Sequence, residues 1–425
     1  MITSKTKNMK KLLFFSLLIA ISIQSAFAQN FPVITSWDIN TSGATGYAGI
    51  LSNCQTVQFD SNNVYISCTC IPGYSIGPWT GDPNIPANQN FVYKMARNPQ
   101  QNTGTLTAVG LGHIGVWSNG VSIFNSQDAN SYNNLGYWHQ NAYYFEGSSF
   151  DNCLGHPQQN GEYHTHVNPK CVYNDLDSTH HSPIIGYAFD GYPVYGAYGY
   201  ANTDGTGGIK RMTSSYQLRT NMVNRDTLPN GTILSSADYG PPVSTSYPLG
   251  DYTEDYLYTA GSGTLDAHNG RFCVTPDYPL GTYAYFVTID SHQTPVYPYT
   301  IGLTYYGVVQ TGNTGPGSGH NTPPNGTKVY VPPTTTGVAE INKSIKFTIE
   351  PNPTKDFSYI YFDALSDNNI TATLFNVQGK LLKTYNNWHT SIGYAVDMTA
   401  YPAGMYFLHL QTAKNYVVQK IIKIN

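Results

Sequence analysis

Apolar residues in the main part of the chain occur in short runs that glycine, proline and asparagine interrupt. The runs are rich in aromatic and β-branched residues and show almost no 3.6-residue helical period. Clear examples are NVYISCTC (63–70), NGVSIF (119–124), PIIGYAFDGYPVYG (183–196), TYAYFVTI (282–289) and PYTIGLTYYG (298–307). This pattern predicts a large, mainly β body domain with much loop.

A second set of strand-like runs fills the end of the chain. They are KFTIEPNPT (346–354), SYIYFDA (358–364), TATLFNV (371–377), KLLKTYN (380–386), GYAVDM (393–398), GMYFLHLQT (404–412) and YVVQKIIKI (416–424). A turn at Gln378-Gly379 between two of these runs favours a hairpin. Strands of this number and length are expected to pack as a small β-sandwich.

Residues 311–341 separate these two regions. They contain Gly, Pro, Thr and Asn in place of a periodic apolar pattern, which is typical of a partly extended linker. The sequence therefore predicts a body at 29–310, a linker at 311–341 and a C-terminal domain at 342–425.

The first 28 residues have the features of a secretory signal peptide. Four lysines precede the apolar run LLFFSLLIAISI (12–23), and an Ala26-x-Ala28 pattern follows it. The apolar run is too short for a membrane span. We expect cleavage after Ala28 and no transmembrane segment in the mature chain.

The composition is poor in charge. Charged residues make up 11% of the chain, whereas soluble domains average about 25%. The whole chain carries a net charge of −4, and most of its excess of acid lies in the body. An acidic body argues against nucleic acids and anionic membrane surfaces as partners.

All six cysteines lie in the body. An even number in an exported chain favours disulfides, although many pairings are open. Cys68 and Cys70 lie on one face of an extended segment, and each is expected to bond elsewhere. Cys153 and Cys171 could close a loop around a histidine motif. The full set of disulfide candidates is Cys54, Cys68, Cys70, Cys153, Cys171 and Cys273.

That motif, GEYHTHVNP (161–169), holds two histidines two residues apart. In a strand, residues i and i+2 face the same side, so His164 and His166 would project together. The glycine and proline at its ends favour a short strand over a helix. Two imidazoles on one side of a strand, at this spacing, are suited to binding one metal ion.

Other donors lie near enough in the sequence to complete such a site. His156 follows a cysteine in DNCLGHP (151–157), and Asp190 lies between glycine-containing turns. Tyr163 and Tyr187 are candidates for a surrounding layer that orients the ligands. Because neutral imidazole suits Zn²⁺ and Cu²⁺, we expect His164, His166, His156 and Asp190 to hold one of these ions.

The C-terminal region resembles a known targeting domain. PNPTKD (351–356), LFNVQGKLL (374–382), DMTAYPAGMYFLHL (397–410) and KIIKIN (420–425) are similar to motifs of the C-terminal sorting domain of the type IX (Por) secretion system. The resemblance implies a Bacteroidota-type host and passage through the periplasm to the type IX machinery. It also implies secretion or attachment at the outer-membrane surface.

The body resembles the YHYH domain family over about 65–305. The resemblance is carried by several motifs, with DNCLGHPQQNGEYHTH (151–166) and HSPIIGYAFDGYPVYG (181–196) at their centre. Thr165 stands where the family's Tyr-His-Tyr-His motif has its second tyrosine. Because Thr165 is expected to face away from the histidines, the change should spare a histidine site. The resemblance implies an exported domain but supplies no chemistry.

Two alternatives to a metal-binding module remain open. One is a metal-assisted hydrolase, with Glu162 or Asp190 as general base and His164 or His166 as acid. The chain has no Gly-x-Ser-x-Gly or His-Glu-x-x-His motif, and GPGSGH (315–320) falls in the predicted linker. The other is a non-catalytic surface protein that binds glycan or protein through aromatic residues in PWTGDP (78–83) and NLGYWHQ (134–140).

Overall fold

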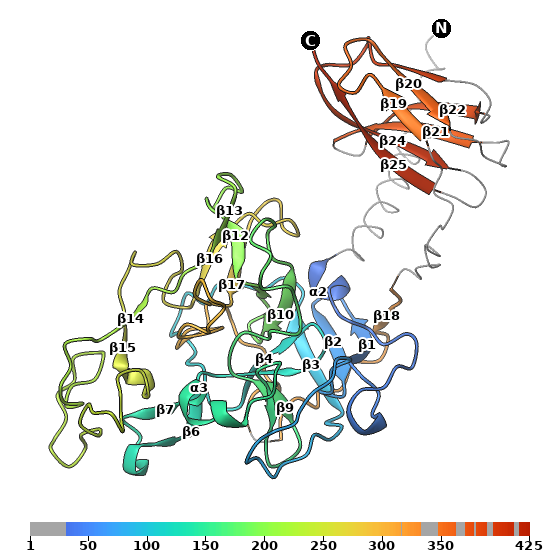
Figure 1. Cartoon of the computed structure of the whole chain (residues 1–425). Coiled ribbons are helices and arrows are strands. Elements are labelled where there is room, and N and C mark those ends of the chain that lie inside the picture. The colour runs from blue at the N-terminus through green and yellow to red at the C-terminus, as the bar shows by residue number, and fades with distance from the viewer. Residues whose placement is uncertain are drawn as a thin grey trace, which may run out of the picture. The chain divides into compact units, whose positions relative to one another are not determined.

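The computed structural model describes residues 31–315, 317–332, 347–362, 370–377, 380–388, 394–411 and 416–425. The predicted signal peptide and the Gln378-Gly379 turn lie outside the described residues. The chain divides into two compact units, one ending at Pro332 and the other starting at Pro333. The regular secondary structure of each unit is mainly β-strand, as the sequence predicts (Figure 1).

The body is organised around an eight-stranded mixed sheet. Its spatial order is β16 (Gly270–Cys273), β17 (Thr282–Phe286), β11 (Pro193–Tyr195), β10 (Ile184–Ala188), β4 (His113–Trp117), β5 (Ser122–Phe124), β9 (Tyr163–Thr165) and β8 (His156–Pro157). Most neighbours are antiparallel, but β5 pairs with β9 and β11 pairs with β17 in parallel. The histidine motif therefore lies near one edge of this sheet.

A second sheet and three two-stranded sheets complete the strands of the body. The four-stranded sheet has the order β18 (Lys328–Tyr330), β1 (Cys54–Phe59), β2 (Asn63–Cys68) and β3 (Phe91–Ala96). The pairs are β6 (Gln127–Ser131) with β7 (His139–Asn141), β12 (Tyr198–Tyr200) with β13 (Ile209–Arg211), and β14 (Tyr216–Leu218) with β15 (Tyr256–Tyr258). In Figure 1, β1, β2 and β3 lie side by side in the blue part of the chain.

Helices contribute single turns to the described part of the body. They are α2 (Pro32–Thr35), α3 (Ala142–Phe145) and the 3₁₀ turns η1 (Tyr47–Gly49), η2 (Tyr132–Asn134), η3 (Gly147–Ser149) and η4 (Thr253–Asp255). None of the helices in the described ranges has the length and apolar content needed to cross a bilayer. The core between the strands is instead filled by aromatic rings, including Trp117, Tyr163, Tyr187 and Tyr285, all less than 2% exposed.

The body continues beyond the predicted boundary at residue 310. Strand β18 pairs antiparallel with β1, and the Asn313 side chain bonds both the N–H and the carbonyl of Lys94. The N–H of Val92 donates to the carbonyl of Gly319 at 2.6 Å. Residues 311–315 and 317–332 are thus part of the body and not of a linker. Their glycines and asparagines bond to strand edges, which a reading of apolar periodicity does not detect.

The C-terminal unit is the predicted small β-sandwich. One sheet has the order β19 (Phe347–Glu350), β20 (Phe357–Phe362) and β23 (Tyr394–Asp397), and the other has β22 (Leu381–Trp388), β21 (Ile370–Asn376), β24 (Gly404–Gln411) and β25 (Tyr416–Lys423). Alternate residues of β20 and β21 are buried in a shared core with Leu408 and Ile421. Strands β21 and β22 pair antiparallel, which confirms the predicted hairpin partners.

One disulfide forms among the six cysteines, and it joins Cys153 to Cys171. This pair is the one expected to enclose the histidine motif. The prediction that the others also form bridges is wrong, since Cys54, Cys68, Cys70 and Cys273 are buried free thiols. Cys54 and Cys68 face each other across β1 and β2, while Cys70 Sγ lies 3.1 Å from the carbonyl of Tyr163. These thiols fill core space as small apolar groups.

Candidate metal centre

Three histidines meet on one face at the edge of the eight-stranded sheet. In the pairing of β8 with β9, His156 lies directly opposite His164, so their side chains share a face. His166 follows two residues after His164 and returns to that face. The predicted projection of His164 and His166 from one side is confirmed, because their Nε2 atoms lie 3.1 Å apart.

A carboxylate completes the group. Glu146 follows α3 and places Oε2 at 2.9 Å from His156 Nε2 and at 3.2 Å from His166 Nε2. One atom from each of Glu146, His156, His164 and His166 falls within 4.8 Å of all the others. The histidine side chains are 9% exposed or less, and that of Glu146 is 22% exposed. The cluster is thus buried on its imidazole side and more open at the carboxylate.

The outer nitrogen of each imidazole is held by an acceptor. His164 Nδ1 lies 3.1 Å from the carbonyl of Glu162, and His166 Nδ1 lies 2.6 Å from the carbonyl of Asn125. His156 Nδ1 lies 2.8 Å from the hydroxyl of Ser149, which donates its own proton to the Glu146 carbonyl. A carbonyl oxygen only accepts, so the Nδ1 atoms carry the protons. The three Nε2 lone pairs are thereby aimed at the centre of the cluster.

Four acceptor atoms facing one another require a positive charge among them. Burial, together with His156 and His166, lowers the pKa of His164 well below its ordinary value, so His164 is neutral at pH 7. Burial alone would raise the pKa of Glu146, but the close approach of the His156 and His166 imidazoles brings it far below its usual range. His156 Nε2 is buried and makes no hydrogen bond of good geometry. A metal ion among the four groups would supply that charge.

Aromatic rings fix the orientation of the imidazoles. Phe124 of β5 stacks on His164, with ring centroids 3.8 Å apart, and meets His166 edge-on at 5.7 Å. The ring of Phe150 lies parallel to that of His166, within 12°. These contacts, with the Nδ1 hydrogen bonds, leave the rings little freedom to turn. The arrangement is the one expected around metal-binding histidines.

A cavity of about 980 Å³ opens beside the cluster. Its lining includes the three histidines and three carboxylates, those of Asp82, Glu146 and Glu162. Among the described residues that line it there is no lysine or arginine, whereas amide and hydroxyl side chains are common. The cavity is therefore suited to neutral polar molecules or cations and disfavours anions.

Comparison with known families agrees with this picture of the body. The family described as YHYH protein matches residues 92–298. The body is a YHYH domain. The matched region contains β8, β9 and Glu146, so the whole cluster lies inside the YHYH domain. No curated protein matches the chain.

The C-terminal unit matches a second family, described as the secretion system C-terminal sorting domain, over residues 348–425. The tail therefore directs the YHYH domain to the type IX secretion system, and the protein is secreted or attached to the cell surface. This confirms the predicted localisation of the protein. The histidines of the tail belong to the sorting domain: His409 lies on β24 against Phe375, and His389 falls outside the described residues.

The structure does not bring Asp190 to the cluster. Asp190 is fully buried in the turn between β10 and β11, where it accepts hydrogen bonds from the Tyr285 hydroxyl at 2.6 Å and the Gly307 N–H at 2.8 Å. These hydrogen bonds hold Gly307 against the turn between β10 and β11. Glu146 provides the carboxylate that the sequence-based hypothesis assigned to Asp190, and no spacing in the sequence links Glu146 to the histidines.

The two tyrosines expected to surround the ligands make other contacts instead. Tyr163 faces the opposite side of β9 and donates to Asp151 at 2.9 Å, and Tyr187 lies 2.8 Å from the Ser36 hydroxyl. Thr165 shares the face of Tyr163 and accepts from Trp117 Nε1 at 2.8 Å. The loss of the family's second tyrosine at Thr165 therefore leaves the histidine face untouched, as strand alternation predicts.

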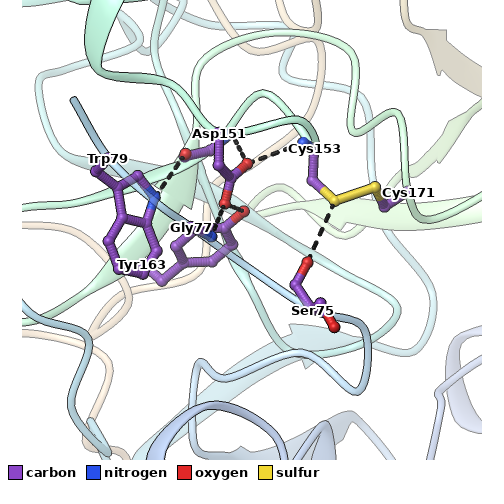
Figure 2. Close-up of a disulfide and its surroundings, with 8 residues drawn as sticks. Ser75, Gly77, Trp79, Asp151, Cys153, Tyr163 and Cys171 are labelled. Atoms are coloured by element: carbon purple, nitrogen blue, oxygen red, sulfur yellow. Dashed lines mark hydrogen bonds between the residues drawn. A yellow bond between two sulfur atoms is a disulfide. The ribbon is translucent and has the colours of Figure 1, made fainter.

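Asp151 organises the loop that carries the cluster. Figure 2 shows its carboxylate between the N–H of Cys153, the N–H of Gly77 and the hydroxyl of Tyr163, at 2.9, 2.8 and 2.9 Å. Next to it, the Cys153–Cys171 disulfide closes a loop with a sequence separation of 18. All three histidines lie inside this loop. The disulfide and Asp151 thus fix the backbone from which the imidazoles project.

The aromatic residues predicted to form a binding surface differ in exposure, and Tyr137 is the most open of them at 37% exposed. Trp138 is 1% exposed and packs in a core cluster with Tyr252. Trp79 is half-buried and lies between Tyr47 and Tyr163.

Proposed function

We propose that this exported YHYH domain binds one divalent transition-metal ion through His156, His164, His166 and Glu146. The observation that carries the proposal is the inward aim of three Nε2 lone pairs beside one carboxylate oxygen. Without a cation, these atoms repel one another at separations of about 3 Å. Four ligand atoms at about 2.0–2.1 Å from a tetrahedral ion lie roughly 3.3 Å apart. Three of the six separations in the cluster, 2.9, 3.1 and 3.2 Å, are close to that value, and all six are within 4.8 Å.

The donor set favours zinc or copper. Neutral imidazole nitrogens suit Zn²⁺ and Cu²⁺, whereas calcium and magnesium prefer oxygen ligands. The cluster contains no thiol, since the free cysteines are buried elsewhere in the body. The ion would be exported with the protein or acquired outside the cell, where the buried imidazoles would hold it.

Metal content tests the proposal directly. The full chain is purified, stripped with a chelator, reloaded with zinc or copper and desalted, and its metal is measured by inductively coupled plasma mass spectrometry. We expect one ion per chain in the wild type and less than about a tenth of that in His164→Ala. His292→Ala, which removes an exposed imidazole from a surface loop, is the matched control and should retain one ion.

The folding of His164→Ala is checked by circular dichroism, and Glu146→Gln provides a milder variant. Glu146→Gln keeps the shape of the side chain and should weaken affinity while leaving the fold intact. Retention of a full ion by His164→Ala, or failure of the reloaded wild type to hold one, would contradict the proposal.

A metal-assisted hydrolase is a second candidate, and the open side of the cluster favours it. Catalytic zinc sites combine three protein ligands with one exchangeable position. Glu146 is the most exposed of the four groups and borders the cavity, so an oxygen of water or substrate can reach the ion from that side. Hydrolysis that depends on added zinc and is lost in His164→Ala would support this candidate.

A further inference from the structure

A second chain of polar groups lines the same cavity and includes no proposed metal ligand. Glu162 Oε1 lies 3.1 Å from His113 Nδ1, and His113 Nε2 lies 2.8 Å from Ser318 Oγ. The three side chains form a carboxylate–imidazole–hydroxyl series, and all three line the cavity. A base oriented by a carboxylate and bonded to a hydroxyl is the arrangement that activates serine as a nucleophile.

The carboxylate of this series is firmly held. The Glu162 side chain is 6% exposed, and it accepts hydrogen bonds from the Ser122 hydroxyl and from Gln158 Nε2 as well as from His113. Tyr93 in turn lies 3.0 Å from Ser122. Its hydrogen-bond partners among the described residues include no lysine or arginine. Its position next to Nδ1 suits it to orient the imidazole.

The imidazole is equally constrained. Phe91 and Phe189 meet the His113 ring edge-on at 5.5 and 5.7 Å, and the His113 side chain is 10% exposed. With Nδ1–H directed at Glu162, the remaining nitrogen, Nε2, presents its lone pair to Ser318. A neutral imidazole in this tautomer is the form that accepts a proton from a hydroxyl.

Ser318 lies in a glycine-rich loop that brings it to the cavity wall. Gly317 and Gly319 on either side of it have φ values of +70° and +82°, a region that favours glycine. The Ser318 hydroxyl has two acceptors within reach, the Gly315 carbonyl at 2.6 Å and His113 Nε2 at 2.8 Å. Rotation about the C–O bond moves the single proton from one acceptor to the other. Ser318, which lies in the segment predicted to be a linker, thus supplies a hydroxyl next to a base.

We propose that Ser318, His113 and Glu162 form a nucleophilic site for acyl transfer from neutral esters. Ser318 Oγ attacks the ester carbonyl carbon while its proton passes to His113 Nε2. The carbon–oxygen bond to the leaving alcohol breaks, and His113 returns the proton to that alcohol. Water then attacks the acyl-serine by the same route, which releases the acid and restores the hydroxyl. Because Asp82, Glu146 and Glu162 line the cavity without a lysine or arginine, the preferred ester carries no negative charge.

A covalent probe tests the site without knowledge of the natural substrate. The full chain is treated with a fluorophosphonate probe, and the labelled residue is identified by peptide mass spectrometry. We expect label on Ser318, none in Ser318→Ala, and a labelling rate at least about 100-fold lower in His113→Gln. Ser148→Ala removes an exposed hydroxyl from the same cavity and should leave the rate unchanged. Hydrolysis of p-nitrophenyl acetate should follow the same order.

The proposal does not rest on metal binding, and the controls separate the two. Labelling of Ser318 should persist after chelation, and Ser318→Ala should retain its metal and its melting temperature. Absence of label on Ser318 in the folded wild type would overturn the proposal, as would labelling at the wild-type rate in His113→Gln. Loss of labelling on chelation would also overturn it, because the reaction would then belong to the metal centre.

Discussion

Removing the disulfide should destabilise the body without dismantling the histidine cluster. The bridge between Cys153 and Cys171 spans a sequence separation of 18. Closing a loop of that length restricts the unfolded chain by an amount equivalent to about 3 kcal/mol at 25 °C. Little contact energy is lost in the folded state, since Cys171 is exposed and a serine is close in size to the buried Cys153 side chain, whose Sγ lies 3.8 Å from the Ser75 carbonyl. The double variant Cys153→Ser/Cys171→Ser should therefore lose about 3 kcal/mol of unfolding free energy.

Urea denaturation of the full chain, followed by tryptophan fluorescence, measures this loss. Reduction of the wild type should give the same shift, and the double variant should not respond to the reductant. Below the unfolding transition, zinc affinity should fall by less than about tenfold, because β-ladder pairing and the Nδ1 hydrogen bonds still position the imidazoles. A double variant as stable as the wild type would refute the loop argument. Loss of all metal binding in the folded variant would refute the claim that the ladder positions the site.

Two further predictions concern buried charges in the body. Arg225 forms a fully buried, two-point ion pair with Asp255, at 2.7 and 2.8 Å. Arg225→Met should therefore lower the unfolding free energy measured in urea by about 3–5 kcal/mol, whereas the exposed control Lys210→Met should lower it by less than about 0.5 kcal/mol. A loss below about 1 kcal/mol in Arg225→Met would contradict this prediction. Burial raises the pKa of Asp190 to about 6 from 3.8, so its contribution to stability is full below pH 3.8 and is lost as the pH rises through about 6. Wild-type stability should fall by up to roughly 3 kcal/mol more than that of Asp190→Asn between pH 4 and 7.5, and parallel pH profiles would contradict the assignment.

Local rules predicted the parts of the fold and site that depend on short stretches of chain. Alternation along a strand placed His164 and His166 on one side and Thr165 on the other. Four of the five aromatic runs of the body contain strands, whereas PYTIGLTYYG (298–307) forms turns with isolated bridges. The placement of Cys153 and Cys171 on either side of the motif pointed to the one disulfide that forms. Each of these features is determined by residues within about 20 positions of one another.

Features that depend on long-range packing were not accessible in this way. Glu146 reaches the cluster through a single helical turn, and the carboxylate chosen from the sequence, Asp190, is held by Tyr285 and Gly307 about a hundred residues away. Ser318 meets His113 across 205 positions, within a segment whose composition predicts a linker. Composition describes how easily such a segment bends, but strand edges elsewhere in the body determine that it is ordered.

X-ray absorption at the metal edge of the zinc-loaded full chain tests the central claim most directly. The account predicts about three nitrogen donors and one or two oxygen donors near 2.0–2.1 Å, with the outer-shell scattering of three imidazoles. His166→Ala should lose the scattering of one imidazole. A spectrum with only oxygen donors, or with fewer than three imidazoles in the wild type, would contradict the claim that His156, His164 and His166 hold one ion.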